Sequence, residues 1–251
     1  MICKQAKWIM YALLAFFICR VMARYTHLFF DLDDTLWDFR YNAHEALMDL
    51  FEKHQLNRYF TSFDHFYQLY EPKNLELWGL YGAGTITKEF LSLERFSYPL
   101  RLVGVHNKAF ARLLSTDFLA IMSTKTKLIP HAQEVLDELR AHAYHLTIVS
   151  NGFRDVQYDK LRNSGLLHYF DTIVLSQEVG FMKPDPRFFE HALEKSAANA
   201  NQVLMVGDNY EVDIVGARQF GIDALHFNRN GSSIDKQPQT IINLKEIFAF
   251  L

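Results

Sequence analysis

The chain has 251 residues, of which 49% are hydrophobic and 22% are charged. This composition is typical of a globular protein with a sizeable core, and it excludes intrinsic disorder, collagen-like repeats and a multi-span membrane protein. The formal net charge is −3, and an acidic chain is a poor partner for a nucleic acid polymer.

The first two dozen residues differ from the rest of the chain. They contain an apolar run of 12 residues, 8–19, and both cysteines of the sequence. A run of this length is too short to cross a bilayer as a standard helix, so we expect no stable membrane span. We expect residues 1–24 to be an N-terminal apolar extension. We expect the true start of the protein to be Met22, and the protein to be cytoplasmic. The alternative is a cleaved signal peptide over 1–23, which would mean export.

The hydrophobic pattern then predicts the following elements in chain order. Residues 26–31 form a short apolar run that ends in a carboxylate, as a buried strand would. From 42 to 123 the pattern is that of helices rich in Phe, Tyr and Leu. Beyond Pro130, strands and helices alternate. The predicted strands are 146–150, 172–175, 203–207 and 224–227, and the predicted helices are 154–164, 186–196 and one that ends at Phe220.

Strands that alternate with helices indicate a parallel sheet covered on both faces. We therefore expect an α/β fold with a Rossmann-like, doubly wound parallel sheet. Its core domain would comprise residues 25–41 and 124–251, and residues 42–123 would form an inserted helical cap domain. The sequence leaves the oligomeric state open.

Two aspartates follow the first predicted strand, where α/β proteins place their ligands. Asp31 and Asp33 lie two residues apart, so one carboxyl group can act as nucleophile and the other as general acid and base. The alternative is an acidic turn in which Asp34 or Thr35 caps the next helix.

A second acidic pair follows the strand at 203–207. Asp208 and Asp213 come after Gly207, and hard oxygen ligands at two strand ends are what Mg²⁺ binds, together with water and a substrate phosphate. The alternative is that Asp208 or Asn209 caps the helix that follows.

Two further segments can hold a phosphate group. Ser150, Asn151 and Gly152 offer a hydroxyl, an amide and a free backbone at a strand-to-helix turn, although such a tripeptide is equally common in ordinary turns. Lys183, just before Pro184, supplies a cation that can neutralise the carboxylates and a bound phosphate. A solvated surface lysine is the alternative.

The order of these residues resembles the haloacid dehalogenase (HAD) superfamily. The matching motifs are Asp31-x-Asp33-x-Thr35, Ser150, Lys183 and Gly207-Asp208-x-x-x-x-Asp213. The helical insert between the first two motifs is similar to the C1 cap of one subgroup. The resemblance covers about residues 25–230.

The resemblance implies an aspartyl-phosphate mechanism with Mg²⁺ as cofactor. Asp31 would attack phosphorus, and Asp33 would protonate the leaving oxygen and then activate water. The metal would be bound by the side chains of Asp31 and Asp208, together with the backbone carbonyl of Asp33. Asp213 would act through water or by orienting Lys183.

The same resemblance implies a phosphate-binding set and a reaction class. Ser150 and Lys183 would hold the transferring phosphoryl group, with amide contacts from Asn151 and Gly152. Halide-removing members resemble this chain but lack a carboxylate two residues after the nucleophile and need no metal. Asp33 and Asp208 therefore favour phosphate hydrolysis over cleavage of a carbon–halogen bond, because an alkoxide leaving group needs a proton and a halide does not.

Longer strings are similar to the YjjG-type pyrimidine 5′-nucleotidases. They are residues 31–39, 150–153, 169–171, 176–180 and 183–186, and parts of the cap stretch 78–96. This resemblance implies hydrolysis of UMP, dUMP and dTMP.

The predicted cap is rich in aromatic residues that could stack on a base, although packing within the helices explains the same pattern. They are Phe60, Phe63, Phe66, Tyr67, Tyr70, Trp78 and Tyr81. Arg95 is the cap residue that we expect to reach the substrate.

We therefore expect a Mg²⁺-dependent phosphomonoester hydrolase that acts on a small phosphorylated molecule, specifically a pyrimidine nucleoside 5′-monophosphate. One alternative is a HAD phosphatase of a sugar phosphate or another small metabolite. A phosphomutase and a non-catalytic binding module that retains the fold are further alternatives.

Overall fold

The structure is a computed structural model that describes residues 24–229, 231 and 239–251. The apolar run, the proposed start at Met22 and the signal-peptide alternative lie outside the described residues. Among the helices of the described part, none is both long enough and apolar enough to cross a membrane.

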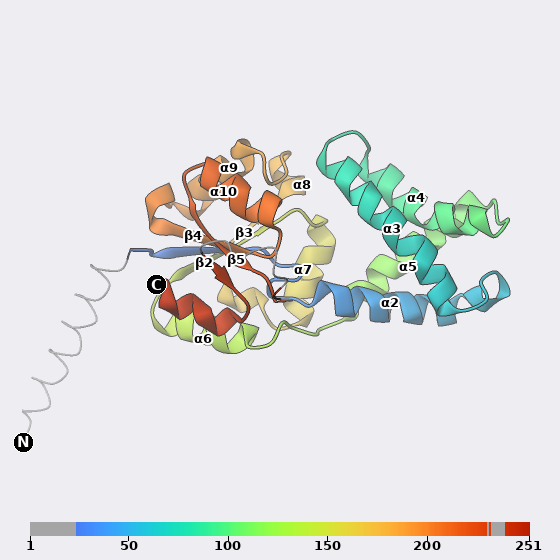
Figure 1. The fold of residues 1–251 in the computed structure, drawn as a ribbon, viewed down its shortest axis with the longest axis horizontal. Coiled ribbons are helices and arrows are strands. Elements are labelled where there is room, and N and C mark those ends of the chain that lie inside the picture. Colours follow the sequence, from blue (N-terminus) through green and yellow to red (C-terminus); the bar gives the residue numbers. More distant parts are fainter. Residues whose placement is uncertain (1–23, 230, 232–238) are drawn as a thin grey trace, which may run out of the picture.

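Six parallel strands form one sheet in the order β3-β2-β1-β4-β5-β6 (Figure 1). The predicted strands agree with the observed ones to within one residue at each end. The sequence analysis missed β6, because two residues carry no periodic pattern. The strands are β1 (His27–Phe30), β2 (His145–Ser150), β3 (Thr172–Leu175), β4 (Val203–Gly207), β5 (Asp223–Phe227) and β6 (Thr240–Ile241).

The register of the central strand brings the candidate residues to one edge of the sheet. Phe30 of β1 pairs with Ile148 of β2 on one side and with Val206 of β4 on the other. Because the three strands are parallel, the residues that follow them emerge at the same edge.

Side chains of β1 alternate between two hydrophobic clusters, one on each face of the sheet. Leu28 and Phe30 join a cluster that includes residues of α6 (Ala132–Ala141) and α7 (Arg154–Asn163). Phe29 joins a cluster with residues of α9 (Pro186–Ser196). Burial on both faces explains why β1 has an unbroken apolar sequence.

The segment predicted as one helix ending at Phe220 consists of two elements. Tyr210–Val215 (η4) forms a π-helix, and α10 (Gly216–Gln219) follows it directly. A short helix, α8 (Ser176–Val179), was not expected. The other predicted helices of the core correspond to α7 and α9, and Pro186 stands in the first turn of α9 with Asp185 as its N-cap.

Four helices form the insertion between β1 and β2. They are α2 (Phe39–Lys53), α3 (Phe63–Gly82), α4 (Lys88–Leu102) and α5 (Lys108–Thr124). Figure 1 shows α3, α4 and α5 beyond one end of the sheet, with α2 running towards them from the core. The expected α/β fold with a helical insertion is confirmed. The domain boundaries at 41/42 and 123/124 stay a prediction, and α2 begins slightly earlier, at Phe39.

The insertion contacts the core at several places: α5 packs against α7, and two further contacts lie beside the candidate residues. At the chain crossing, the backbone of Trp37 pairs with Leu128, and the Asp38 amide donates to the Lys127 carbonyl over 3.1 Å. At the second place, the ring of Phe153 packs against Trp78 and Tyr81 of α3, with ring centroids 5.2 and 6.1 Å apart. The space between core and insertion is thus bounded on two sides.

Candidate active site

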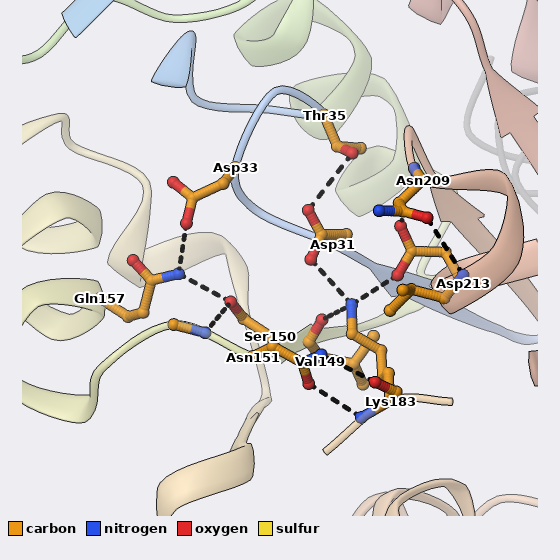
Figure 2. Close-up of polar contacts among 12 residues, drawn as sticks. Asp31, Asp33, Thr35, Val149, Ser150, Asn151, Gln157, Lys183, Asn209 and Asp213 are labelled. Atoms are coloured by element: carbon orange, nitrogen blue, oxygen red, sulfur yellow. Dashed lines mark hydrogen bonds and ion pairs between the residues drawn. The ribbon is translucent and has the colours of Figure 1, made fainter. Parts of the chain in front are cut away.

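The residues singled out in the core converge where β1, β2 and β4 end. Asp31 directly follows β1, Ser150 ends β2, and Asp208 directly follows β4. Lys183 lies in the loop between α8 and α9 and reaches the same place (Figure 2).

Lys183 is the centre of a buried ion-pair network. Its Nζ donates to Asp31 Oδ1 over 2.8 Å, to Asp213 Oδ1 over 2.7 Å and to the Val149 carbonyl over 2.7 Å (Figure 2). Burial lowers the pKa of Lys183, but the charges of Asp213 and Asp31 outweigh this effect and leave the pKa above its ordinary value. Lys183 is therefore a fixed cation beside Asp31, and the surface-lysine alternative is wrong.

Asp213 is held towards Lys183 by its surroundings. Its Oδ2 accepts from the Asn209 amide over 3.1 Å. A Cβ on Gly207 would stand 2.4 Å from this same oxygen, so only glycine leaves room for the carboxylate. Asn209 also caps the π-helix by accepting from the Val212 amide over 3.1 Å. The capping role weighed for Asp208 or Asn209 thus falls to Asn209.

Three carboxyl groups can hold a metal ion. Among the described residues, Asp31, Asp208 and Asp213 each offer an oxygen within 4.8 Å of the others. Burial, followed by repulsion from Asp31 and Asp213, raises the pKa of Asp208 to about 8. The carboxylate oxygens suit a hard divalent cation such as Mg²⁺. Both oxygens of Asp213 are engaged, one with Lys183 and one with the Asn209 backbone amide, so Asp31 and Asp208 are the members best placed for direct contact.

Ser150 keeps a donor available at the end of β2. Its Oγ accepts from Gln157 Nε2 over 2.7 Å and from the Gly152 amide over 3.1 Å, so its own O–H can still donate to a ligand. A Cβ on Gly152 would stand 2.2 Å from Gln157 Nε2. Glycine at this position therefore permits the Gln157 contact.

The side chain of Asn151 is engaged with Lys183. Asn151 Oδ1 accepts from the Lys183 amide, and Asn151 Nδ2 donates to the Lys183 carbonyl, both over 2.9 Å. This pair of hydrogen bonds ties the Lys183 loop to the end of β2. The Asn151 side chain thus fixes the lysine, and an amide contact of Asn151 with phosphate stays a prediction.

Asp33 points towards α7, away from Asp31 (Figure 2). Its two oxygens accept from Lys160 Nζ over 2.7 Å and from Gln157 Nε2 over 2.8 Å. Lys160 is only 2% exposed, and its Nζ lies 4.4 Å from the centre of the Trp37 ring. The sequence analysis missed Gln157 and Lys160. Their spacing of three places them on one face of a helix, but no sequence signal separates a buried lysine from a solvated one.

A cavity of about 340 Å³ lies between the core and the insertion. Asp33, Gln157 and Lys160 line it from the core, and Arg95 lines it from α4. The aromatic residues of the insertion divide between the two expected roles: Tyr67, Tyr70 and Trp78 line the cavity, whereas Phe60 and Phe66 are buried in the hydrophobic core.

Comparison with known proteins places the chain in a family. Residues 25–221 match the model of the haloacid dehalogenase-like hydrolases, and the chain belongs to this family. The resemblance inferred from the motifs is thereby confirmed. With the acidic triad in place, the chain is a phosphatase of the HAD type.

Three similar proteins bear on the substrate and on the metal. The chain is 34% identical over 203 residues to the pyrimidine 5′-nucleotidase YjjG of Escherichia coli, covering 80% of this chain and 85% of that one. It is 31% identical over 206 residues to a glyceraldehyde 3-phosphate phosphatase of Methanothermobacter thermautotrophicus, covering 80% and 84%. The crystal structure of the HAD-hydrolase YfnB of Bacillus subtilis bound to magnesium has a TM-score of 0.82 at 30% identity, covering 91% of this chain and 99% of that one.

Proposed function

We propose that the protein is a Mg²⁺-dependent phosphatase of pyrimidine nucleoside 5′-monophosphates, which works through a phosphorylated Asp31. The observation that carries the chemistry is the buried group of Asp31, Lys183 and Asp213 beside Asp208, at the ends of parallel strands. The likeness to YjjG supports the substrate class.

The first half-reaction transfers the phosphoryl group to the protein. A carboxylate oxygen of Asp31 attacks phosphorus, and the bond between phosphorus and the nucleoside oxygen breaks. Lys183, fixed 2.8 Å from Asp31, holds the nucleophile in place and offers positive charge to the phosphoryl oxygens. The Ser150 hydroxyl donates to the same group.

Asp33 acts as general acid in the first half-reaction and as general base in the second. As a carboxylic acid it gives its proton to the leaving nucleoside oxygen; as a carboxylate it then takes a proton from the water that attacks the phosphorylated Asp31. Lys160 and Gln157 occupy both Asp33 oxygens. Each Asp33 oxygen retains a second lone pair, which can carry the transferred proton while these contacts remain.

The metal fits the residues that are present. Asp31 and Asp208, with the Asp33 carbonyl, would hold Mg²⁺, and the magnesium-bound structure of YfnB supports this choice. When bound, Mg²⁺ would neutralise charge on the phosphate. Asp213, paired with Lys183 over 2.7 Å, would act behind these residues as a positioning group.

The lining of the cavity favours a leaving group that contains a planar ring. Tyr67, Tyr70 and Trp78 line its insertion side, and aromatic faces favour stacking on a planar base. A second candidate is a phosphatase of small sugar phosphates, which the likeness to the glyceraldehyde 3-phosphate phosphatase favours. Both candidates use the same core residues.

A phosphate-release assay with Mg²⁺ separates the two candidates. We expect kcat/KM for UMP, dUMP and dTMP to exceed that for glyceraldehyde 3-phosphate by at least about tenfold. A preference for glyceraldehyde 3-phosphate would retain the mechanism and overturn the substrate class. A folded protein that releases no phosphate from any of these compounds would overturn both.

A further inference from the structure

Polar atoms without partners line the insertion side of the active-site cavity. Arg95 of α4 and Asn74 of α3 face the same cavity as Asp33 and Lys160. In residues 24–229, Arg95 Nε, Asn74 Oδ1 and the neighbouring Tyr70 hydroxyl are buried and lack a hydrogen-bond partner. Because an unpaired buried polar atom is costly, it commonly marks a place that a ligand fills.

Arg95 is held by neutral groups. The residue is 2% exposed. Its Nη2 donates to Ser115 Oγ over 3.3 Å, and its guanidinium lies 5.0 Å from the centre of the Phe118 ring. Burial lowers the pKa of Arg95, and Tyr70 offsets part of that change. Within the described part of the chain, no carboxylate forms an ion pair with Arg95, and its neighbour Tyr70 is neutral, so a ligand in the cavity can supply the acceptor for the Nε–H group.

Asn74 offers a hydrogen-bond acceptor beside the donor of Arg95. Its Oδ1 is an acceptor, so the insertion side of the cavity presents both an unmet donor and an unmet acceptor. Tyr67, Trp78 and Phe118 give the same cavity flat apolar walls. A ligand that satisfies this site is planar and carries a donor next to an acceptor.

We propose that Arg95 and Asn74 form a subsite for the hydrogen-bonding edge of a planar heterocycle. A ring N–H donates to Asn74 Oδ1, and a neighbouring ring carbonyl oxygen accepts from Arg95 Nε. This inference rests on the proposed function: uracil and thymine present such an edge, and a small sugar phosphate does not. Arg95 and Asn74 thereby set specificity, and the core residues carry out the chemistry.

The first test compares two substrates in three proteins. The readout is kcat/KM for UMP divided by kcat/KM for phenyl phosphate, which has no ring N–H or carbonyl. We expect Arg95→Met to lower this ratio by at least about tenfold. Arg112→Met, which replaces an exposed arginine of α5, serves as the matched control and should leave the ratio unchanged. An unchanged ratio in Arg95→Met would overturn the proposal.

The second test uses the native protein, so it does not depend on the folding of a variant. Methylation of the ring nitrogen N3 of UMP removes the donor for Asn74 Oδ1, and we expect kcat/KM to fall by at least about tenfold. Equal values for UMP and N3-methyl-UMP would overturn the subsite. A native preference for glyceraldehyde 3-phosphate over UMP is a different result, because it would overturn the proposed function itself. A preference for a phosphorylated carboxylic acid would show that Arg95 pairs with an anion, which also contradicts the proposal.

Discussion

Asp31 and Asp208 are acids that the fold withdraws from water and places near other acids. Burial raises the pKa of Asp31 to about 7, against the opposing effect of Lys183 and with further repulsion from Asp213 and Asp33. Burial and repulsion from Asp31 raise the pKa of Asp208 to about 8. In the metal-free protein both groups thus retain protons far above their ordinary range near 4.

This difference predicts how pH and Mg²⁺ together affect stability. Between about pH 4 and pH 8 the folded chain holds more protons on Asp31 and Asp208 than the unfolded chain does, so these groups make the metal-free protein less stable as pH rises. Mg²⁺ needs the deprotonated carboxylates. The increase in Tm that Mg²⁺ produces should therefore be larger at about pH 8.5 than at about pH 5.5.

Thermal unfolding with Mg²⁺ or with EDTA at these two pH values checks the prediction. Asp208→Asn is the informative variant, because it removes one of the two titrating groups and should weaken both the effect of Mg²⁺ and its pH dependence. Asp155→Asn, at a position where the side chain is 85% exposed, should behave like the native protein. A Mg²⁺ effect that is the same at both pH values would contradict the assignment of these ligands.

Sequence alone located the residues whose place depends on a strand end. Asp31, Ser150 and Asp208 follow apolar runs that form buried parallel strands, so their convergence could be expected before the structure was known. Lys160 and Asn74 could not be found in this way, since their roles depend on which helix face meets the cavity. The engagement of Asn151 with the Lys183 backbone is likewise a tertiary contact that no local pattern encodes.

At the scale of elements, the turn between β2 and α7 contacts the insertion. It begins after Ser150 and contains Phe153, which is 5% exposed and packs against Trp78 and Tyr81 of α3. Lys88 of α4 lies over the same ring, with Nζ 4.4 Å from its centre. Phe153 therefore packs the end of β2 against the insertion, and we expect this contact to favour a closed arrangement of the two parts.

Removing that ring should weaken closure. We expect Phe153→Ala to raise KM for the preferred substrate by about tenfold, because the closed, binding-competent arrangement becomes less populated, and to cost about 3 kcal/mol of stability. Steady-state kinetics and thermal unfolding measure the two effects. Phe90→Ala, which removes an exposed phenylalanine of α4, should change neither. An unchanged KM in Phe153→Ala would show that the contact has no part in closure.

The elements themselves differ in how well the sequence predicts them. Strands β3 and β4 were predicted to the residue because both are continuous apolar runs between turn residues. The π-helix η4 was predicted only as part of a longer helix, since the hydrophobic pattern of a short segment does not separate α from π hydrogen bonding.

At the scale of the whole molecule, the proposed function divides chemistry and selection between two parts of the chain. The sheet end supplies Asp31, Asp33 and Lys183, and the helical insertion supplies Arg95 and the aromatic wall. The order of motifs along the sequence indicates this division. How the insertion sits over the sheet depends on contacts such as that between Phe153 and Trp78, which join segments far apart in the chain.

Asp31 is the proposed nucleophile of a Mg²⁺-dependent phosphatase. The most direct test is phosphate release from UMP by the native protein and by Asp31→Asn, each with Mg²⁺, alongside thermal unfolding of both. We expect at least about a thousandfold loss of kcat in Asp31→Asn with the fold retained, since Asp213 still pairs with Lys183. Native-like phosphate release by Asp31→Asn would contradict this proposal.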